Sequence, residues 1–153
     1  MIILNMPILA NNKKAQFDFE FMKKYEAGII LQGPEVKSAK SGGISFAGSY
    51  VGISKDNELK AYGLKIARYK KAGLSPDPDR EKKLLLTKKE NNEIRQYLSQ
   101  KGLTIIPTSI YTKNGLIKVE LAVAKGRKKV DKRERIKERD IVRRLRSPYG
   151  DDA

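Results

Sequence analysis

The sequence predicts a mainly β fold with short helices (α+β), arranged as an OB-like β-barrel that is closed or partly open. Two observations lead to this expectation. Short runs with strand-like alternation, about six in number, are separated by Gly, Asn and Pro turns up to residue 124. The strongest hairpin signal of the chain stands at the end of that region. At 153 residues, the chain is long enough for one such domain and a tail.

The first extended segment covers residues 16–31. Phe17, Phe19 and Phe21 alternate with polar or longer side chains, which predicts three rings on one face of a strand. The apolar run 27–31 predicts a second, more buried strand. The spacing of the rings favours a place in the core over a role in stacking on bases.

The middle of the chain alternates between short elements. Residues 35–40 are expected to form a short helix, which Pro34 opens and a Gly pair closes. Strands are expected at 44–53 and 59–66, with a turn at Asp56-Asn57 between them. Residues 69–82 contain two Pro, one Gly and many charges, and are expected to form a mobile loop.

The best-signalled helix begins at Thr87. Thr87 and Glu90 have the spacing of a capping box, in which each side chain binds a free amide at the helix start. Gly102 stands where a left-handed helix cap is expected. The side chains expected to point inward are Ile94, Tyr97 and Leu98.

A hairpin is predicted around Asn114-Gly115, because this dipeptide favours a type I′ turn. The turn puts Tyr111, Lys118 and Glu120 on one face and apolar residues on the other. The expected cross-strand pairs are Thr112 with Ile117, Ile110 with Val119, Thr108 with Leu121, and Ile106 with Val123.

Composition points to a polyanionic partner. The net charge is +15 and the pI is near 9.9, which favours nucleic acid. The chain has no Cys and no His, so it lacks the usual zinc ligands and the common general base. No apolar stretch is long enough for a membrane span, and a cytoplasmic protein without cofactor is expected. The acidic cluster Asp77, Asp79 and Glu81 offers oxygens for Mg²⁺, but a solvated turn is favoured and an enzyme is not expected.

A basic tail is expected to follow the barrel, which would occupy residues 1–124. Residues 125–153 hold 12 of the 33 Lys/Arg and seven of the ten Arg, and carry a net charge of +6. Arg suits phosphate, because its planar group donates in pairs. Ile141 and Leu145 share one helical face, but this stripe is too thin to support a free helix. The tail is therefore expected to be disordered when free and helical once bound to a polyanion.

Several blocks, in matching order and spacing, resemble the SsrA-binding protein family (small protein B). Together they extend from about residue 11 to residue 140, and no single block is specific. The blocks are Asn12-Lys-Lys-Ala15, Tyr25-Glu-Ala-Gly-Ile-Ile-Leu-Gln-Gly33, Glu35-Val-Lys-Ser38, Lys83-Leu-Leu-Leu86, Lys101-Gly-Leu-Thr104 with Pro107, Lys118-Val-Glu120, Ala124-Lys-Gly126 and Asp131-Lys-Arg133.

The resemblance implies an OB-type barrel that binds the tRNA-like part of transfer-messenger RNA. It also implies trans-translation, in which the pair enters a stalled ribosome and the nascent chain is tagged for degradation. The family's RNA-facing positions match Asn12, Glu26, Leu85 and Lys118. Nearby lysines suit phosphate contacts on charge grounds: Lys13, Lys14, Lys83 and Lys125.

The family's tail fills the decoding centre and the mRNA channel of the small ribosomal subunit, so the protein is expected to bind there as a monomer. The matching tail positions are Gly126, Asp131, Lys132 and Arg133 for the decoding centre, and Ile136 to Leu145, with Ile141 between them, for the channel helix. Lys128 is also expected among the ribosome-binding residues of the tail. One departure is Val130, where the family often has a His or Tyr ring that stacks on a ribosomal base.

Three alternatives remain open at this point. Glu26 would repel phosphate, so it either accepts from a base amine, orients a lysine, or simply pairs with Lys24. The whole chain could instead be a generic ribosomal or ribosome-assembly protein that binds RNA. A metal-dependent nuclease built on Asp77, Asp79 and Glu81 is the remaining class.

Overall fold

The computed structural model describes residues 7–70 and 75–126. The tail positions Lys128, Asp131, Lys132, Arg133, Ile136, Ile141 and Leu145, and the helix predicted there, lie outside the described residues. In chain order the elements are β1 (Ile8–Asn11), α1 (Lys13–Asp18), β2 (Phe19–Ile29), α2 (Gly33–Lys40), β3 (Ile44–Ser45), β4 (Tyr50–Ile53), β5 (Leu59–Tyr62), β6 (Lys65–Ile66), β7 (Lys82–Leu85), α3 (Lys88–Leu98), β8 (Leu103–Lys113) and β9 (Leu116–Gly126).

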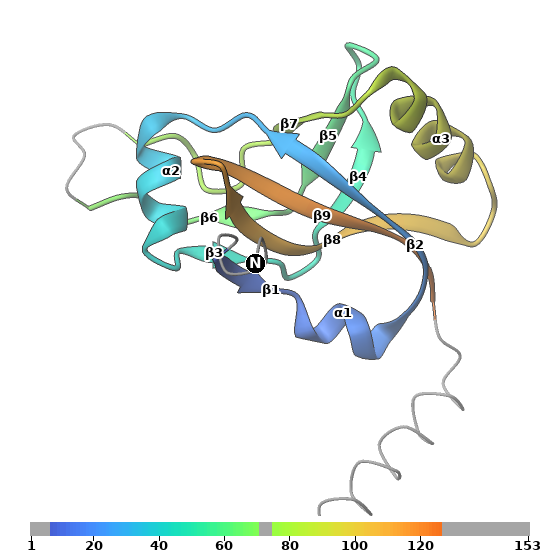
Figure 1. Ribbon diagram of the computed structural model, residues 1–153, viewed down its shortest axis with the longest axis horizontal. Helices are drawn as coiled ribbons and strands as arrows, with labels where there is room; N and C mark the ends of the chain where they lie inside the picture. The colour runs from blue at the N-terminus through green and yellow to red at the C-terminus, as the bar shows by residue number, and fades with distance from the viewer. Residues whose placement is uncertain (1–6, 71–74, 127–153) are drawn as a thin grey trace, which may run out of the picture.

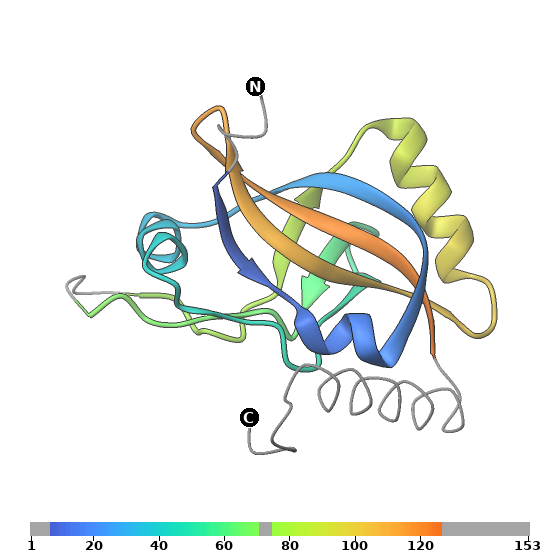
Figure 2. The ribbon, with the colours of Figure 1, turned by 60° about the horizontal axis from the view of Figure 1, so that its bottom comes forward.

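The fold is mainly β with three short helices in the described part, as the sequence predicts. Seven strands form one antiparallel sheet in the order β1-β8-β9-β2-β7-β5-β4, and β3 pairs with β6. Figure 1 shows α2 and α3 at opposite ends of this curved sheet. No strand pairing within residues 7–70 and 75–126 joins β1 to β4, so hydrogen bonds do not close the sheet into a ring. Figure 2 shows α1 beside the sheet, connecting β1 to the start of β2.

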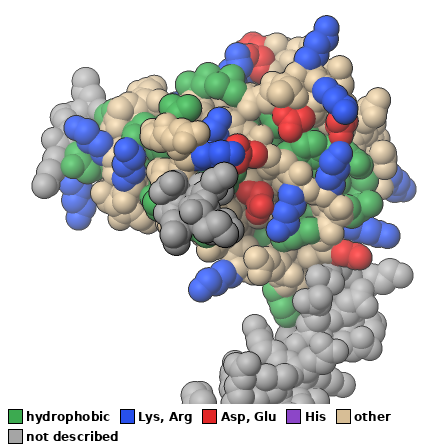
Figure 3. Space-filling view, in the orientation of Figure 1, with side chains coloured by type: hydrophobic (Ala, Val, Ile, Leu, Met, Phe, Trp, Pro, Cys, Tyr) green, Lys and Arg blue, Asp and Glu red, His purple; other side chains and the backbone are tan. Residues whose placement is uncertain are grey.

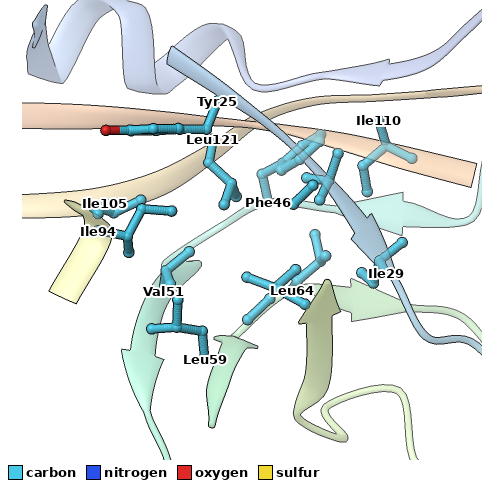
Figure 4. Close-up of a cluster of buried hydrophobic side chains, with 14 of the residues drawn as sticks. Tyr25, Ile29, Phe46, Val51, Leu59, Leu64, Ile94, Ile105, Ile110 and Leu121 are labelled. Carbon is cyan, nitrogen blue, oxygen red and sulfur yellow. The ribbon is translucent and has the colours of Figure 1, made fainter. Parts of the chain in front are cut away.

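The main core lies inside the curve of the sheet, where side chains from β2, β4, β5, β8 and β9 meet (Figure 4). α3 contributes Ile94, which is fully buried, while Tyr97 and Leu98 pack partly buried against the same cluster. The capping box predicted at Thr87 and Glu90 is present in both directions. The sequence prediction of this helix and its inward face is therefore confirmed.

The hairpin turn is as predicted, but its register changes partway along the strands. Asn114 and Gly115 have φ of 52° and 78°, as a type I′ turn requires, and both predicted pairs nearest the turn are present. A β-bulge then falls between Pro107 and Ser109. The predicted pairs of Thr108 with Leu121 and Ile106 with Val123 are therefore wrong: the observed pairs are Pro107 with Leu121, Ile106 with Ala122 and Ile105 with Val123.

The bulge coincides with a proline and with two contacts from other parts of the chain. Pro107 has no N–H to give to the ladder, and such residues concentrate at bulges. The extra residue, Thr108, is held from both sides: its carbonyl accepts from the Asn12 N–H at 2.8 Å, and its hydroxyl donates to Glu120 at 2.6 Å. As a result Ile105 enters the main core, while Ile106 packs on the opposite side of the sheet.

The N-terminal expectation is corrected in two ways. Residues 13–18 form α1, so Phe17 belongs to a helix and not to a strand with Phe19 and Phe21. The rest of the segment is one strand, β2, with a bulge between Phe21 and Lys23. Phe19 and Phe21 are half-buried outside the main core, against a small cluster of Ala15, Ile106 and Ala124.

The expected strands 44–53 and 59–66 are each divided in two. Gly48 and Gly63, with φ of 74° and 70°, turn the chain between the halves. The predicted loop 69–82 ends sooner, because Lys82 starts β7 and is fully buried. Its ammonium donates to three backbone carbonyl oxygens, those of Leu64 at 2.7 Å, Pro78 at 3.1 Å and Arg80 at 2.6 Å.

Candidate nucleic-acid interface

The candidate interface is the outer face of the sheet, meaning the side of β8, β9, β2 and β7 that points away from the main core. Antiparallel pairing sets its side chains in rows across the strands. One row places Tyr111, Lys118, Gly28 and Leu85 as successive Cα partners on β8, β9, β2 and β7. The adjacent row places Asn11, Ser109, Glu120 and Glu26 on β1, β8, β9 and β2.

In the first row, Gly28 leaves a flat patch of backbone between the apolar side chain of Leu85 and the cationic side chain of Lys118. We call this patch the flat floor. Leu85 is 50% exposed although it is apolar. Gly28 separates it from Lys118, and a Cβ added at Gly28 would lie 3.2 Å from the Cβ of Leu85. Within the described residues, Lys118 makes no ion pair. A base or ribose can therefore lie over Gly28 against Leu85, while Lys118 meets a phosphate.

Glu26 sits beside this floor and is held by two neighbours. The Tyr111 hydroxyl donates to Glu26 Oε2 at 2.5 Å, and Lys113 Nζ lies 3.3 Å from Oε1. The Tyr111 hydrogen bond, followed by Lys113, lowers the pKa of Glu26, so the carboxylate stays ionised. Burial, followed by the same hydrogen bond, raises the pKa of Tyr111 and keeps its hydroxyl a donor. The carboxylate is thus presented as a fixed acceptor for a base amine or a hydroxyl.

The structure excludes one alternative for Glu26 and limits the role of Tyr111. Glu26 does not pair with Lys24, which instead lies 3.8 Å from Glu120. Tyr111 lies on the face that the hairpin predicts, but it is only 8% exposed, so its ring is not available as a platform for a base. Its contribution is the hydroxyl that orients Glu26.

Asn12 acts within the protein. Its side-chain oxygen accepts the N–H of Ala15 at 3.2 Å, and its amide donates to the carbonyl of Pro107 at 2.9 Å. Asn12 thereby caps α1 and ties it to β8. Lys13 and Lys14 follow directly and are exposed on the first turn of the helix.

The remaining predicted lysines are not gathered around Lys118. Lys83 lies on β7 and forms an ion pair with Glu58. Lys125 and Gly126 pair with Glu20 and Phe19 at the far end of β9. Lys125 lies seven residue steps along β9 from Lys118, a distance of about 23 Å.

The acidic cluster is dispersed among separate partners. Asp77 accepts the backbone N–H of Asp79 at 2.9 Å, as in a local turn. Asp79 lies 3.9 Å from Lys65, and Glu81 lies 3.0 Å from Lys60. Across residues 7–70 and 75–126, no three His, Cys, Asp or Glu side chains are placed to share a metal ion. None of the helices in this part has the length and hydropathy that crossing a membrane requires.

Sequence reasoning missed Gly28 and Lys113. Gly28 carried a usable signal, because an isolated glycine within a strand pattern often marks a close approach. Lys113 also carried a sequence signal, since it adjoins the Asn114-Gly115 turn at the end of the strand that contains Tyr111. Figure 3 shows why charge alone would not have located the site: acidic and basic side chains are interspersed on the face in view.

Fold and site together define a small, basic, mainly β protein. Its sheet presents an exposed leucine, a glycine, a lysine without an ion pair among the described residues, and a carboxylate oriented by a tyrosine hydroxyl. The model of the SmpB protein family matches residues 9–149. The chain therefore belongs to the SmpB family. It is 49% identical to the SsrA-binding protein of Coprothermobacter proteolyticus over 144 residues, covering 92% of this chain and 95% of the relative.

Two further matches agree with this family. The SsrA-binding protein of Thermosipho melanesiensis is 50% identical over 143 residues, which cover 92% of this chain and 97% of the relative. A solved structure described as "tmRNA-SmpB: a journey to the center of the bacterial ribosome" superposes with a TM-score of 0.68. It is 39% identical, and the match covers 85% of this chain and 94% of that one.

Proposed function

We propose that the protein binds the tRNA-like part of transfer-messenger RNA with its outer face and brings it to stalled ribosomes for trans-translation. The observation that carries the proposal is the row of Leu85, Gly28 and Lys118 beside the held carboxylate of Glu26. This arrangement offers one contact for a base, one for a phosphate and one acceptor. Membership of the SmpB family, the name of the relatives and a net charge of +15 support the same partner.

The sheet serves this function as a partly open OB-like barrel. β4, the last strand of the hydrogen-bonded order, packs against β8, so the two ends of the curved sheet approach each other. This curvature supports the proposal, because OB barrels bind nucleic acid on an outer sheet face. Asn12 would act by holding α1, and Lys13, Lys14 and Lys83 by contacting phosphates.

The barrel, residues 1–124, would bind the tRNA-like RNA, and the tail, residues 125–153, would bind the ribosome. Lys125 and Gly126 are the last residues of β9, and so mark the transition. The tail would enter the decoding centre and mRNA channel and become helical there, through the residues from Gly126 to Leu145 named above. The protein would act as a cytoplasmic monomer without catalysis or cofactor.

Two assays test this division: affinity for the tRNA-like RNA, and peptide tagging on stalled ribosomes. A chain ending after Gly126 should fold and lose little RNA affinity, but tagging should vanish. Ile141→Pro should do the same, because a proline within a helix costs about 3 kcal/mol. Lys118→Ala should weaken RNA binding itself. Full tagging by the shortened chain would refute the assignment of the tail, and loss of RNA binding on shortening would move the tail to the RNA.

A generic ribosomal or ribosome-assembly role is the alternative. The RNA that copurifies with the full chain from cells distinguishes the two. One stable species with tRNA-like ends supports the proposal. A mixture of ribosomal RNA without this species contradicts it.

A further inference from the structure

A hollow lies between α1 and the loop that joins β3 to β4. We call it the α1 cleft and define it by Lys13, Lys14, Ser45, Ser49, Tyr50 and Ile106 on its walls. It shares no lining residue with the row of Leu85, Gly28 and Lys118. The walls of the cleft combine three features that suit one kind of ligand.

The first feature is positive charge at the rim. Lys13 and Lys14 are exposed, and neither makes an ion pair with another described residue. One carboxylate, that of Asp18, also lines the cleft, so the charged side chains of its described walls sum to +1. Asn12 fixes the start of α1 and therefore the position of both lysines. A single phosphate group matches this rim.

The second feature is a buried hydroxyl without a partner. Ser49 is only 7% exposed, and its Oγ makes no hydrogen bond within the described chain. Its backbone N–H is already used, since it donates to the carbonyl of Phe46 at 2.9 Å. Buried hydroxyls are normally satisfied. The exception in the wall of a cleft points to a ligand atom as the missing partner.

The third feature is an aromatic ring that is held in place before any ligand arrives. Tyr50 also lines the cleft and is 48% exposed. Its ring stacks on Tyr62, with centroids 5.5 Å apart and an angle of 18° between the planes. Both rings lie over Gly52, where an added Cβ would come within 3.1 Å of the Tyr62 ring and 3.6 Å of the Tyr50 ring. Fixed, exposed rings beside lysines are typical of stacking sites for unpaired bases.

We propose that the α1 cleft binds one unpaired RNA nucleotide. Its base stacks on Tyr50, its phosphate lies between Lys13 and Lys14, and the Ser49 hydroxyl bonds to the base or ribose. The inference rests on the proposed function, since it takes the protein to be an RNA binder. It adds a second contact point that the outer face does not include. The nucleotide comes either from the tRNA-like RNA or from ribosomal RNA.

Photocrosslinking locates the nucleotide and identifies its source. The full chain is mixed in one arm with tRNA-like RNA that carries 4-thiouridine, and in the other with small ribosomal subunits that carry it. A crosslink to the peptide that contains residues 44–50 is expected in one arm. The RNA used in that arm is then the source of the bound nucleotide. The absence of this crosslink in both arms, with crosslinks elsewhere in the protein, overturns the proposal.

Substitutions test the fit without disturbing the core. Ala47→Trp fills the cleft from an exposed loop position, and Tyr50→Ala removes the platform. Each should weaken binding to the crosslinked RNA about tenfold, while Tyr50→Phe should retain affinity because it keeps the ring. Gln100→Trp, at an exposed position outside the cleft, is the matched control.

The outcome separates this inference from the proposed function. If Ala47→Trp and Tyr50→Ala bind as wild type while Lys118→Ala weakens binding, the cleft is empty in the complex and only the inference fails. If none of the variants, Lys118→Ala included, changes RNA affinity, the outer-face interface fails as well. Thermal melting of each variant shows that it is folded.

Discussion

The Tyr111 hydroxyl donates a 2.5 Å hydrogen bond to Glu26 across the width of β9, which lies between their strands. The bond joins a buried phenol to an exposed carboxylate. It explains how an acidic side chain can hold one orientation on the proposed RNA-binding surface. Removing either partner should therefore affect both stability and binding.

Tyr111→Phe should reduce stability and RNA affinity together. It deletes only the hydroxyl, so the ring still fills its buried site. The lost bond should lower the free energy of unfolding by about 1 kcal/mol, since Glu26 is partly exposed and solvent weakens the contact. Urea unfolding measures this loss, and RNA affinity should fall several-fold because Glu26 is no longer oriented. Tyr97→Phe, on α3, is the matched control, and an equal loss of affinity there would contradict the role of Tyr111.

The stability of the protein should depend on Glu26 at acidic pH. Its folded-state pKa lies below the ordinary value of 4.5, with the Tyr111 hydrogen bond as the main cause. A lowered carboxyl pKa contributes stability above 4.5, and this contribution is lost as the pH falls from 4.5 through the folded-state pKa. Below pH 4.5, the free energy of unfolding of Glu26→Gln should therefore decrease less steeply with falling pH than that of the wild type. Urea unfolding at a series of pH values measures both. Identical slopes would show that Glu26 is not stabilised in its ionised form.

RNA binding should weaken steeply with salt, because lysine–phosphate contacts release counterions. With roughly four to six contacts, log affinity against log salt should have a slope of about −3 to −5. Lys118→Ala should reduce that slope by about one unit. Lys101→Ala, at an exposed turn after α3, should leave it unchanged. A salt-independent affinity would rule out phosphate contacts as the basis of binding.

Gly28→Val should lower stability and RNA affinity, because the new side chain would clash with Leu85. The first added carbon already lies 3.2 Å from the Cβ of Leu85, so larger branches must displace Leu85. We expect a loss of about 1 kcal/mol in stability and a larger relative loss in RNA affinity, because the flat floor disappears. Gly33→Ala, where nothing lies within 4 Å of the new Cβ, is the matched control. Wild-type affinity of Gly28→Val would mean that no RNA group lies over this floor.

Local sequence determined the elements whose signals involve neighbouring residues. The type I′ turn follows from Asn114-Gly115, because both positions need positive φ. α3 follows from its capping box, which satisfies amides within one turn of the chain. The resemblance indicated Asn12, Glu26, Leu85 and Lys118 as one group. The structure places Glu26, Leu85 and Lys118 together on the outer face, whereas the side chain of Asn12 caps α1 and binds β8.

Tertiary structure decided what depends on residues far apart in the chain. The bulge at Thr108 reverses the faces of Ile105 and Ile106 because Asn12 and Glu120 hold Thr108 in place. Lys82 can be buried because its ammonium donates hydrogen bonds to three backbone carbonyl oxygens. One belongs to Leu64, 18 residues earlier, and the other two to the loop before β7. The buried Tyr111 orients Glu26 through a hydrogen bond between residues 85 positions apart in the chain. Sequence periodicity reports alternation along one strand, whereas burial, register after a bulge and hydrogen-bond partners depend on which strands lie beside it.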